Sequence, residues 1–539
     1  MKKKLLSYVM AFALVIAGLC IPEAEPVYAA SIKISSVKDL LAMEDNPSGS
    51  YYLAKDITVP KDTCLFSDGT SFLGTLDGKG HKLKGYKSTE APALFESAKF
   101  AEFKNLSMTN VDINVKGSAA ALVLESDGCL FKNITVSGKI VSSGDGGDVG
   151  AIAARGNGSM EKCSNSAKIT AKTKVMDKSA GGLAGSFDAT SLKNCSNSGT
   201  VALATGTDTF VMDSYSYPMS LAVSGLTAGR SDLVTGCKNS GNLTMKLNYK
   251  VDVNKSENYY LWTSGITVNV SGICSYVSKV SSSGNTGKIK IVSGKSALIT
   301  SGCHVGGVAG ENAYNVAASK CYNTGDVAVS GGFAGDNQGD GDCWVGGLFG
   351  YGGGTTECYN TGNVTVSLPS GHLGGVLFIG GLSGQNRGTL NNCYNTGNVK
   401  VTNKGKNANS STMLGGNTIK IGGLAGNADV LTGNGGASNR GVCNYSTGKV
   451  TYPALSDHGV LIGHWEGPFM AGKSLYYDNY YTRSSGPVYG HGDTSWGAFQ
   501  PTAKKVSSIT SGSCPKLSSK YWTYSSKHKR LILKNNKEK

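Results

Sequence analysis

The chain has 539 residues, of which 75 are glycine and 12 are proline, and its formal net charge is +15. Glycine is about twice as frequent as the ~7% of an average protein, but apolar residues recur at fixed intervals, which excludes a disordered polymer. The basic charge favours contact with anionic polymers, although charge alone assigns no function.

The first 29 residues have the layout of a secretory signal peptide. Basic residues 2–4 precede an apolar run at 5–19, which is too short to span a bilayer comfortably. Ala29 ends an A-x-A-like cleavage site, and a lipoprotein attached at Cys20 is the alternative. We predict an extracellular protein, secreted or associated with the cell surface, with no integral membrane segment after cleavage.

Residues 30–115 are predicted to form an N-terminal cap and the first coils of a repetitive fold. Ser36 is a candidate N-cap for a short helix over 36–43. Such a helix would cover one end of the fold, where strand edges are otherwise unpaired. Residues 72–83 (FLGTLDGKGHKL) fit the first coil.

Two short patterns alternate between residues 116 and 465. The first is aliphatic-Gly-Gly-aliphatic-x-Gly, as at 305–310, 345–350 and 421–426. The second is Cys-x-Asn-[Ser/Thr]-Gly-x-aliphatic, as at 321–327, 358–364 and 393–399. A period near 35 residues with insertions fits one coil of a three-faced β-helix. We therefore predict an all-β fold, a right-handed parallel β-helix (solenoid).

Equivalent side chains should line up along the axis of this solenoid. Asn323, Asn360 and Asn395 would stack about 4.8 Å apart, the spacing between neighbouring strands. Stacked amides can hydrogen-bond to one another along such an axis. We predict a structural asparagine ladder rather than a ligand site.

The two patterns together resemble the GLUG-motif repeat family of bacterial secreted and surface proteins. The resemblance is clearest between Val305 and Val450 and covers most of residues 50–465. It implies a β-helical extracellular region like those of adhesins. Such repeats also accompany some Gram-positive metallopeptidases that cleave immunoglobulin A, but the motif itself carries no catalytic residue.

Residues 466–539 lose the repeat and gain aromatic side chains. We predict an irregular C-terminal region and cap. Its last strand, at Arg530–Leu533, is expected to close the second end of the solenoid.

Tyr322, Tyr359 and Tyr394 follow the repeated cysteine and should point outward, because neighbouring residues of a strand face opposite ways. The resulting aromatic strip is the candidate ligand-binding site, suited to sugar rings or a peptide. The alternative is that the rings only stack on one another and stabilise neighbouring coils.

The cysteines before these tyrosines, Cys321, Cys358 and Cys393, should point inward on adjacent coils. An exported protein may form disulfides, but we favour a ladder of buried thiols that pack as small apolar groups. Cys303 and Cys343, which occupy equivalent slots, are the best single candidate for a disulfide.

The sequence contains no H-E-x-x-H and no G-x-S-x-G motif, so we expect no catalytic site. We also expect no cofactor and no metal. Residues 467–474 match the P-loop expression by chance, since no helix is predicted after them. Asp336, Asp340 and Asp342 are read as a solvated loop in preference to a calcium site.

The predicted function is that of a non-catalytic secreted or cell-surface protein. It would use one face of the β-helix to bind a glycan, a cell-wall polymer or a host surface protein, and no nucleic acid. The alternatives are a glycan-cleaving β-helix enzyme, either a polysaccharide lyase or a hydrolase, and a purely structural spacer.

Overall fold

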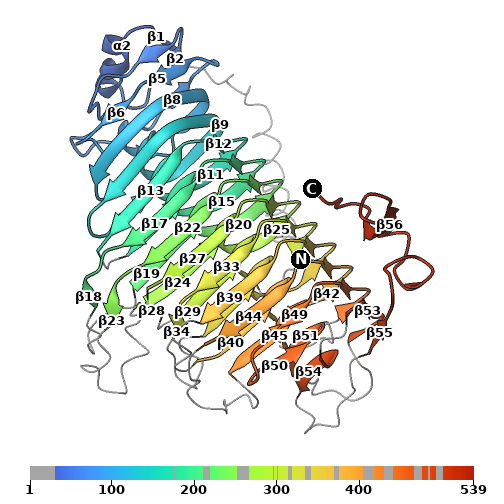
Figure 1. Cartoon of the computed structure of the whole chain (residues 1–539). Helices are drawn as coiled ribbons and strands as arrows, with labels where there is room; N and C mark the ends of the chain where they lie inside the picture. The colour runs from blue at the N-terminus through green and yellow to red at the C-terminus, as the bar shows by residue number, and fades with distance from the viewer. Residues whose placement is uncertain are drawn as a thin grey trace, which may run out of the picture.

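The computed structural model describes residues 31–539 except 175–176, 211–218, 252–265, 295–296, 300–301, 314–317, 334–341, 369–374, 405–417, 430–440, 467–475, 484–485 and 493–501. The chain winds into successive rungs whose strands pair in parallel with the rungs above and below (Figure 1). This confirms the predicted all-β parallel β-helix. The expected signal peptide at 1–29 lies outside the described residues.

The first face is a nine-stranded parallel sheet. Its strands are β10 (Asp148–Val149), β14 (Lys178–Gly181), β19 (Met219–Ser224), β24 (Ile266–Ser271), β29 (Gly302–Gly306), β35 (Cys343–Gly346), β40 (Leu377–Gly380), β45 (Ile419–Gly422) and β50 (Asp457–Gly459). Each is followed by a Gly-Gly turn or an equivalent short turn.

The second face belongs to the larger sheet and follows that turn. Its strands are β11 (Ala153–Glu161), β15 (Ala184–Lys193), β20 (Thr227–Thr235), β25 (Cys274–Ser281), β30 (Ala309–Asn312), β36 (Phe349–Gly352), β41 (Ser383–Asn386), β46 (Ala425–Asp429), β51 (Ile462–Glu466) and β54 (Tyr489–Gly492).

The third face begins after a corner that is itself a stack of short strands. The corner strands are β12 (Ser164–Asn165), β16 (Ser196–Asn197), β21 (Lys238–Asn239), β26 (Gly284–Asn285), β32 (Tyr322–Asn323), β38 (Tyr359–Asn360), β43 (Tyr394–Asn395), β48 (Tyr445–Ser446) and β53 (Asn479–Tyr481). The face strands are β13 (Lys168–Thr173), β17 (Val201–Thr205), β22 (Leu243–Leu247), β27 (Ile289–Ser293), β33 (Val327–Ser330), β39 (Val364–Leu368), β44 (Val399–Asn403) and β49 (Val450–Thr451).

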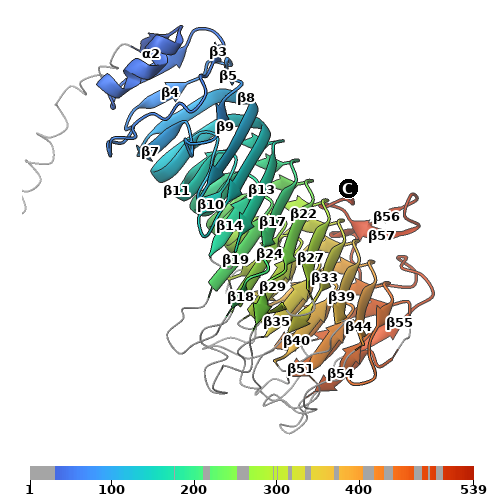
Figure 2. The ribbon, with the colours of Figure 1, turned by 60° about the vertical axis from the view of Figure 1, so that its left-hand side comes forward.

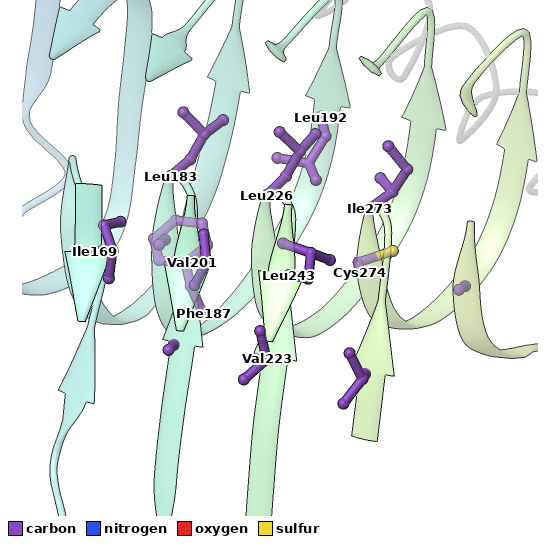
Figure 3. Packing of buried hydrophobic residues seen from close by; sticks show 14 of the residues in the cluster. Ile169, Leu183, Phe187, Leu192, Val201, Val223, Leu226, Leu243, Ile273 and Cys274 are labelled. Carbon is purple, nitrogen blue, oxygen red and sulfur yellow. The ribbon is translucent and has the colours of Figure 1, made fainter. Parts of the chain in front are cut away.

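The interior is filled by apolar side chains that repeat from rung to rung. Figure 3 shows Leu183, Leu226 and Ile273 at the same place on successive rungs, and each is fully buried. Ile169, Val201 and Leu243 form a second such column. Because a single rung cannot bury these side chains by itself, its stability depends on the rungs on both sides.

The Gly-Gly turn keeps the first two faces close together. A Cβ atom on Gly347 would lie 2.1 Å from the carbonyl oxygen of Gly381 and 2.5 Å from Cγ of Asn360. No side chain fits at that distance from backbone, so the second glycine of the repeat is a packing requirement.

The predicted asparagine ladder is confirmed and is longer than expected. Each side-chain Nδ2 donates to the Oδ1 of the next rung at 2.7–2.9 Å. The ladder runs through Asn165, Asn197, Asn239, Asn285, Asn323, Asn360 and Asn395. Each Nδ2 also donates to a backbone carbonyl two residues further on. This accounts for the invariable Asn of the repeat within residues 321–399.

The N-terminal end is covered as predicted. Helix α2 (Val37–Leu41) and the 3₁₀ helix η2 (Ala42–Asp45) lie at this end of the solenoid (Figure 2). In the chain they connect β1 (Ile32–Ile34) to β2 (Ser50–Leu53). The first rungs then pair in the order β1, β2, β4 (Thr75–Asp77), β8 (Glu102–Lys116) and β9 (Val123–Ser143). The Ser36 hydroxyl accepts a hydrogen bond from the Asp39 amide at 3.1 Å, which makes Ser36 the N-cap. No helix in the described part of the chain is long and apolar enough to cross a membrane.

The C-terminal region differs from the prediction in two respects. Rung pairing continues beyond residue 466, through β53, β54 and β55 (Ala503–Lys505). The strand expected at Arg530–Leu533 forms as β57, but it pairs with β56 (Trp522–Ser525) in an antiparallel hairpin on the outside of the solenoid. The expectation that this strand closes the end of the solenoid is therefore wrong.

Candidate functional site

The predicted tyrosine strip exists on the corner strands. Tyr322, Tyr359 and Tyr394 point away from the interior and stack ring on ring, with centroids 5.7 and 5.2 Å apart. Tyr445 extends the stack at 4.8 Å. The outward direction is confirmed, and the rings stack on one another because the sheet register places the same residue at the same point of each rung.

The strip is nevertheless buried, because the C-terminal segment 506–539 lies over it. Tyr359 is fully buried, and its hydroxyl donates to the carbonyl of Lys537 at 3.1 Å. The Tyr394 hydroxyl donates to the carboxylate of Glu538 at 2.8 Å, and Trp522 packs 5.9 Å from the Tyr394 ring. A solvent-facing strip is thus corrected to a surface that the chain itself covers. Ligand binding by these rings stays a prediction.

The cysteines of the second pattern lie inside, on adjacent rungs, as predicted. The amide of Cys321 donates to Sγ of Cys358 at 3.2 Å, and the amide of Cys358 donates to Sγ of Cys393 at 3.4 Å. Cys303 and Cys343 face each other in register on β29 and β35, both buried and both thiols in this structure. The register agrees with the predicted columns of inward cysteines, and the choice between thiols and a Cys303–Cys343 disulfide stays a prediction.

We expect the native thiols to resist alkylation. All thirteen described cysteines are free, and only Cys64 and Cys443 are half-exposed. Burial raises the pKa of Cys64 to about 11 and that of Cys274 to about 12, so little thiolate exists at neutral pH. Iodoacetamide at pH 7.5 should label the folded protein slowly, at Cys64 and Cys443, and label all thirteen in denaturant. Mass spectrometry without reductant checks both results, and a linked Cys303–Cys343 peptide would contradict them.

A second group of side chains, which we name the outer corner, lies where the first two faces meet. On the first face, inward residues alternate with outward ones, so Trp344 points outward between the buried Cys343 and Val345. The outer corner comprises His304, Trp344, Phe378, Lys420 and Asp457 from the first face and Glu311, Tyr351, Gln385, Asn427 and His464 from the second. Each set occupies one register position on successive rungs.

The middle of the outer corner is aromatic. The Trp344 ring lies 5.1 Å from the half-buried Tyr351 ring and 4.7 Å from the imidazole of His304. Its indole N–H donates to Oε1 of Gln385 at 2.9 Å. His304 also contacts the carboxylate of Glu311. Half-exposed rings with polar groups fixed between them are typical of binding surfaces.

The C-terminal end of the outer corner is polar. Nδ1 of His464 lies 3.2 Å from Oδ2 of Asp457, and both side chains are buried. Burial lowers the pKa of His464 below its usual value, and the nearby Lys420 lowers it further, against the opposing effect of Asp457. The imidazole is therefore neutral at pH 7. Since a carboxylate only accepts, its proton is assigned to Nδ1.

A shallow cavity of about 310 Å³ lies towards the N-terminal end of the second face. Its lining includes Lys99, Asp127, Glu125 and Arg155. The Arg155 guanidinium is paired with the Glu125 carboxylate, and all four side chains are exposed. Such solvent-screened pairs contribute little binding specificity of their own.

The outer corner was not predicted from the sequence. Its signal is the residue before each aliphatic-Gly-Gly unit, which reads His304, Trp344, Phe378 and Lys420. A residue type that varies within an otherwise fixed repeat is not constrained by packing, and this position could have been aligned from the Gly-Gly pairs. No cluster of metal-ligating side chains occurs among the described residues. Asp336, Asp340 and the P-loop-like stretch fall outside them.

No family model matches the chain, and no curated protein matches it either. Membership of the GLUG-motif family therefore stays a prediction. Among solved structures, the chain is similar to a candidate immunoglobulin A1 protease from Bacteroides ovatus, with 16% identity and a TM-score of 0.33, over 49% of this chain and 76% of that one. It is also similar to an IgA1 protease, with 17% identity and a TM-score of 0.28, over 55% of this chain and 21% of that one. Similarity at this level carries no argument about activity.

Proposed function

We propose that this protein is an exported, non-catalytic binding protein that holds a carbohydrate against the outer corner of its β-helix. The observation that carries the proposal is the half-exposed pair of Trp344 and Tyr351, 5.1 Å apart and bordered by Glu311 and Gln385. Aromatic faces supply apolar contact area, and the fixed polar groups beside them supply hydrogen bonds.

The position of these side chains supports the proposal further. The tyrosine strip is occupied by the C-terminal segment, whereas Trp344 and Tyr351 keep part of their surface open. They lie on β35 and β36, two consecutive strands of one rung in a stiff stack, so the distance between them is fixed before a ligand binds. Such preorganisation lowers the entropic cost of binding an extended chain.

Replacing Trp344 by alanine should weaken carbohydrate binding strongly without unfolding the protein. The ring lies outside the core, so we expect a loss of binding of about tenfold or more and a melting temperature close to that of the parent. A glycan array followed by calorimetry on the best ligand makes the measurement. Tyr524→Ala, at an aromatic residue that is 53% exposed on the C-terminal hairpin, is the matched control. Equal binding by the parent and Trp344→Ala would reject the proposal.

A glycan-cleaving enzyme is the second candidate. It is favoured by the convergence of Asp457, His464 and Lys420 on neighbouring strands, where Asp457 orients a neutral imidazole as it would orient a general base. Incubating the protein with the bound glycan and assaying for new reducing ends separates the two functions. Binding without cleavage is the expected result.

A further inference from the structure

The polar end of the outer corner contains hydrogen-bonding groups that the protein does not use. Asn427 is fully buried, and neither Oδ1 nor Nδ2 of its amide has a hydrogen-bond partner. Nε2 of His464 is likewise buried without a partner. An unpaired polar atom in the interior is destabilising, so three of them at one place call for an explanation.

These atoms lie next to one another on neighbouring rungs. Asn427 on β46 and His464 on β51 are direct register partners, which places them about 4.8 Å apart along the axis. They continue the column of Glu311, Tyr351 and Gln385, so they extend the same row of side chains that holds the aromatic pair.

Their chemistry is specific. With its proton on Nδ1 facing Asp457, the His464 imidazole offers a hydrogen-bond acceptor at Nε2. The Asn427 amide offers one further acceptor and two donor hydrogens. No unpaired atom in this set carries a charge. A ligand group that complements these atoms must both donate and accept hydrogen bonds. It must also be uncharged, because burying a charge is unfavourable.

We propose that Asn427 and His464 bind the hydroxyl groups of an uncharged carbohydrate, with Asp457 as the positioning residue that fixes the imidazole tautomer. This inference rests on the proposed function and names the class of ligand. A sugar hydroxyl donates to Nε2 of His464, and a neighbouring hydroxyl exchanges hydrogen bonds with the Asn427 amide. A uronate carboxylate would find the amide donor and the nearby Lys420 ammonium, but it would also face two acceptors and the Asp457 carboxylate, so acidic glycans are disfavoured.

The test uses variants that remove the polar atoms but keep the volume. In full-length protein, Asn427→Leu should be at least as stable as the parent, because it replaces an unpaired amide by an apolar group. His464→Phe also removes the Nδ1 hydrogen bond to the buried Asp457 carboxylate, so it should be less stable than the parent but still folded. Both should weaken binding of neutral oligosaccharides by about tenfold or more. The same substitutions at the exposed Asn398 and the half-exposed His81, Asn398→Leu and His81→Phe, are the controls. The probes are cellotriose, chitotriose and trigalacturonate.

The outcomes separate this inference from the proposed function. If Trp344→Ala loses binding while Asn427→Leu and His464→Phe keep it, the aromatic site stands and the hydroxyl site is rejected. If Asn427→Leu is strongly destabilised instead, its amide holds a structural water and the inference is wrong. If trigalacturonate binds more tightly than both neutral probes, the ligand class is wrong. If the parent binds no carbohydrate, both proposals fail.

Discussion

Replacing Trp522 by alanine is expected to detach the C-terminal segment from the solenoid. Trp522 is 2% exposed, packs 5.4 Å from the Tyr445 ring, and donates its indole N–H to Oδ1 of Asn392 at 3.1 Å. Truncating a buried tryptophan costs about 3–5 kcal/mol. The hairpin cannot offset this loss by itself, since isolated hairpins are marginally stable in water. What then holds the segment is the set of hydrogen bonds around Lys537 and Glu538, which we expect to be insufficient.

The loss should be local, because each rung of a solenoid depends mainly on its neighbours. We expect trypsin to cleave the variant within 506–539 while residues 31–505 stay resistant. The uncovered tyrosine strip should bind a hydrophobic dye and promote self-association. Tyr524→Ala, on the same hairpin but 53% exposed, should behave as the parent does. Equal protease resistance of Trp522→Ala and the parent would show that the hairpin is held by other contacts.

The covered strip also explains why the sequence misled at Tyr322, Tyr359 and Tyr394. Repeat spacing determines which residues align along the axis and, through alternation in a strand, which way they point. It carries no information about a segment nearly 150 residues further on that folds back, as Glu538 does to reach Tyr394. The sequence did offer one indication: residues 506–539 contain aromatic side chains that could pack against an outward column of tyrosines.

The fold was predictable for the opposite reason. The Gly-Gly turns, the inward cysteines and the asparagine ladder are each required by contacts between equivalent residues of neighbouring rungs, so every repeat carries the same constraint. The outer corner was not predictable in this way. Its members, such as Trp344 and His464, differ from rung to rung. The contact of His464 with Asp457 becomes apparent only in the three-dimensional structure.

The asparagine ladder should be the most sensitive part of the stack. In the parent, Oδ1 of Asn360 accepts from Asn323 at 2.8 Å, while its Nδ2 donates to the Gly362 carbonyl at 2.7 Å and to Asn395 at 2.9 Å. Asn360→Asp keeps the shape and the accepting Oδ1, but it replaces Nδ2 by a second oxygen. The Gly362 carbonyl and Oδ1 of Asn395, which both accepted from Nδ2, then face an oxygen. Only a protonated carboxyl can donate to one of them, so burial and these neighbours raise the pKa of the new acid in the folded state.

The direction of the pH effect follows from that raised pKa. The unfolded chain loses the proton near pH 4, whereas the folded variant retains it to higher pH, so stability falls as pH rises above 4, by about 1.4 kcal/mol per unit until the folded carboxyl ionises. Urea unfolding of Asn360→Asp at pH 4 and pH 7 should therefore show the greater loss at pH 7. Asn398→Asp is the control, because Asn398 is exposed and its Oδ1 only accepts, from the Lys449 amide. A pH-independent loss at position 360 would mean that water reaches the ladder, and that the amides do not act as a continuous buried chain.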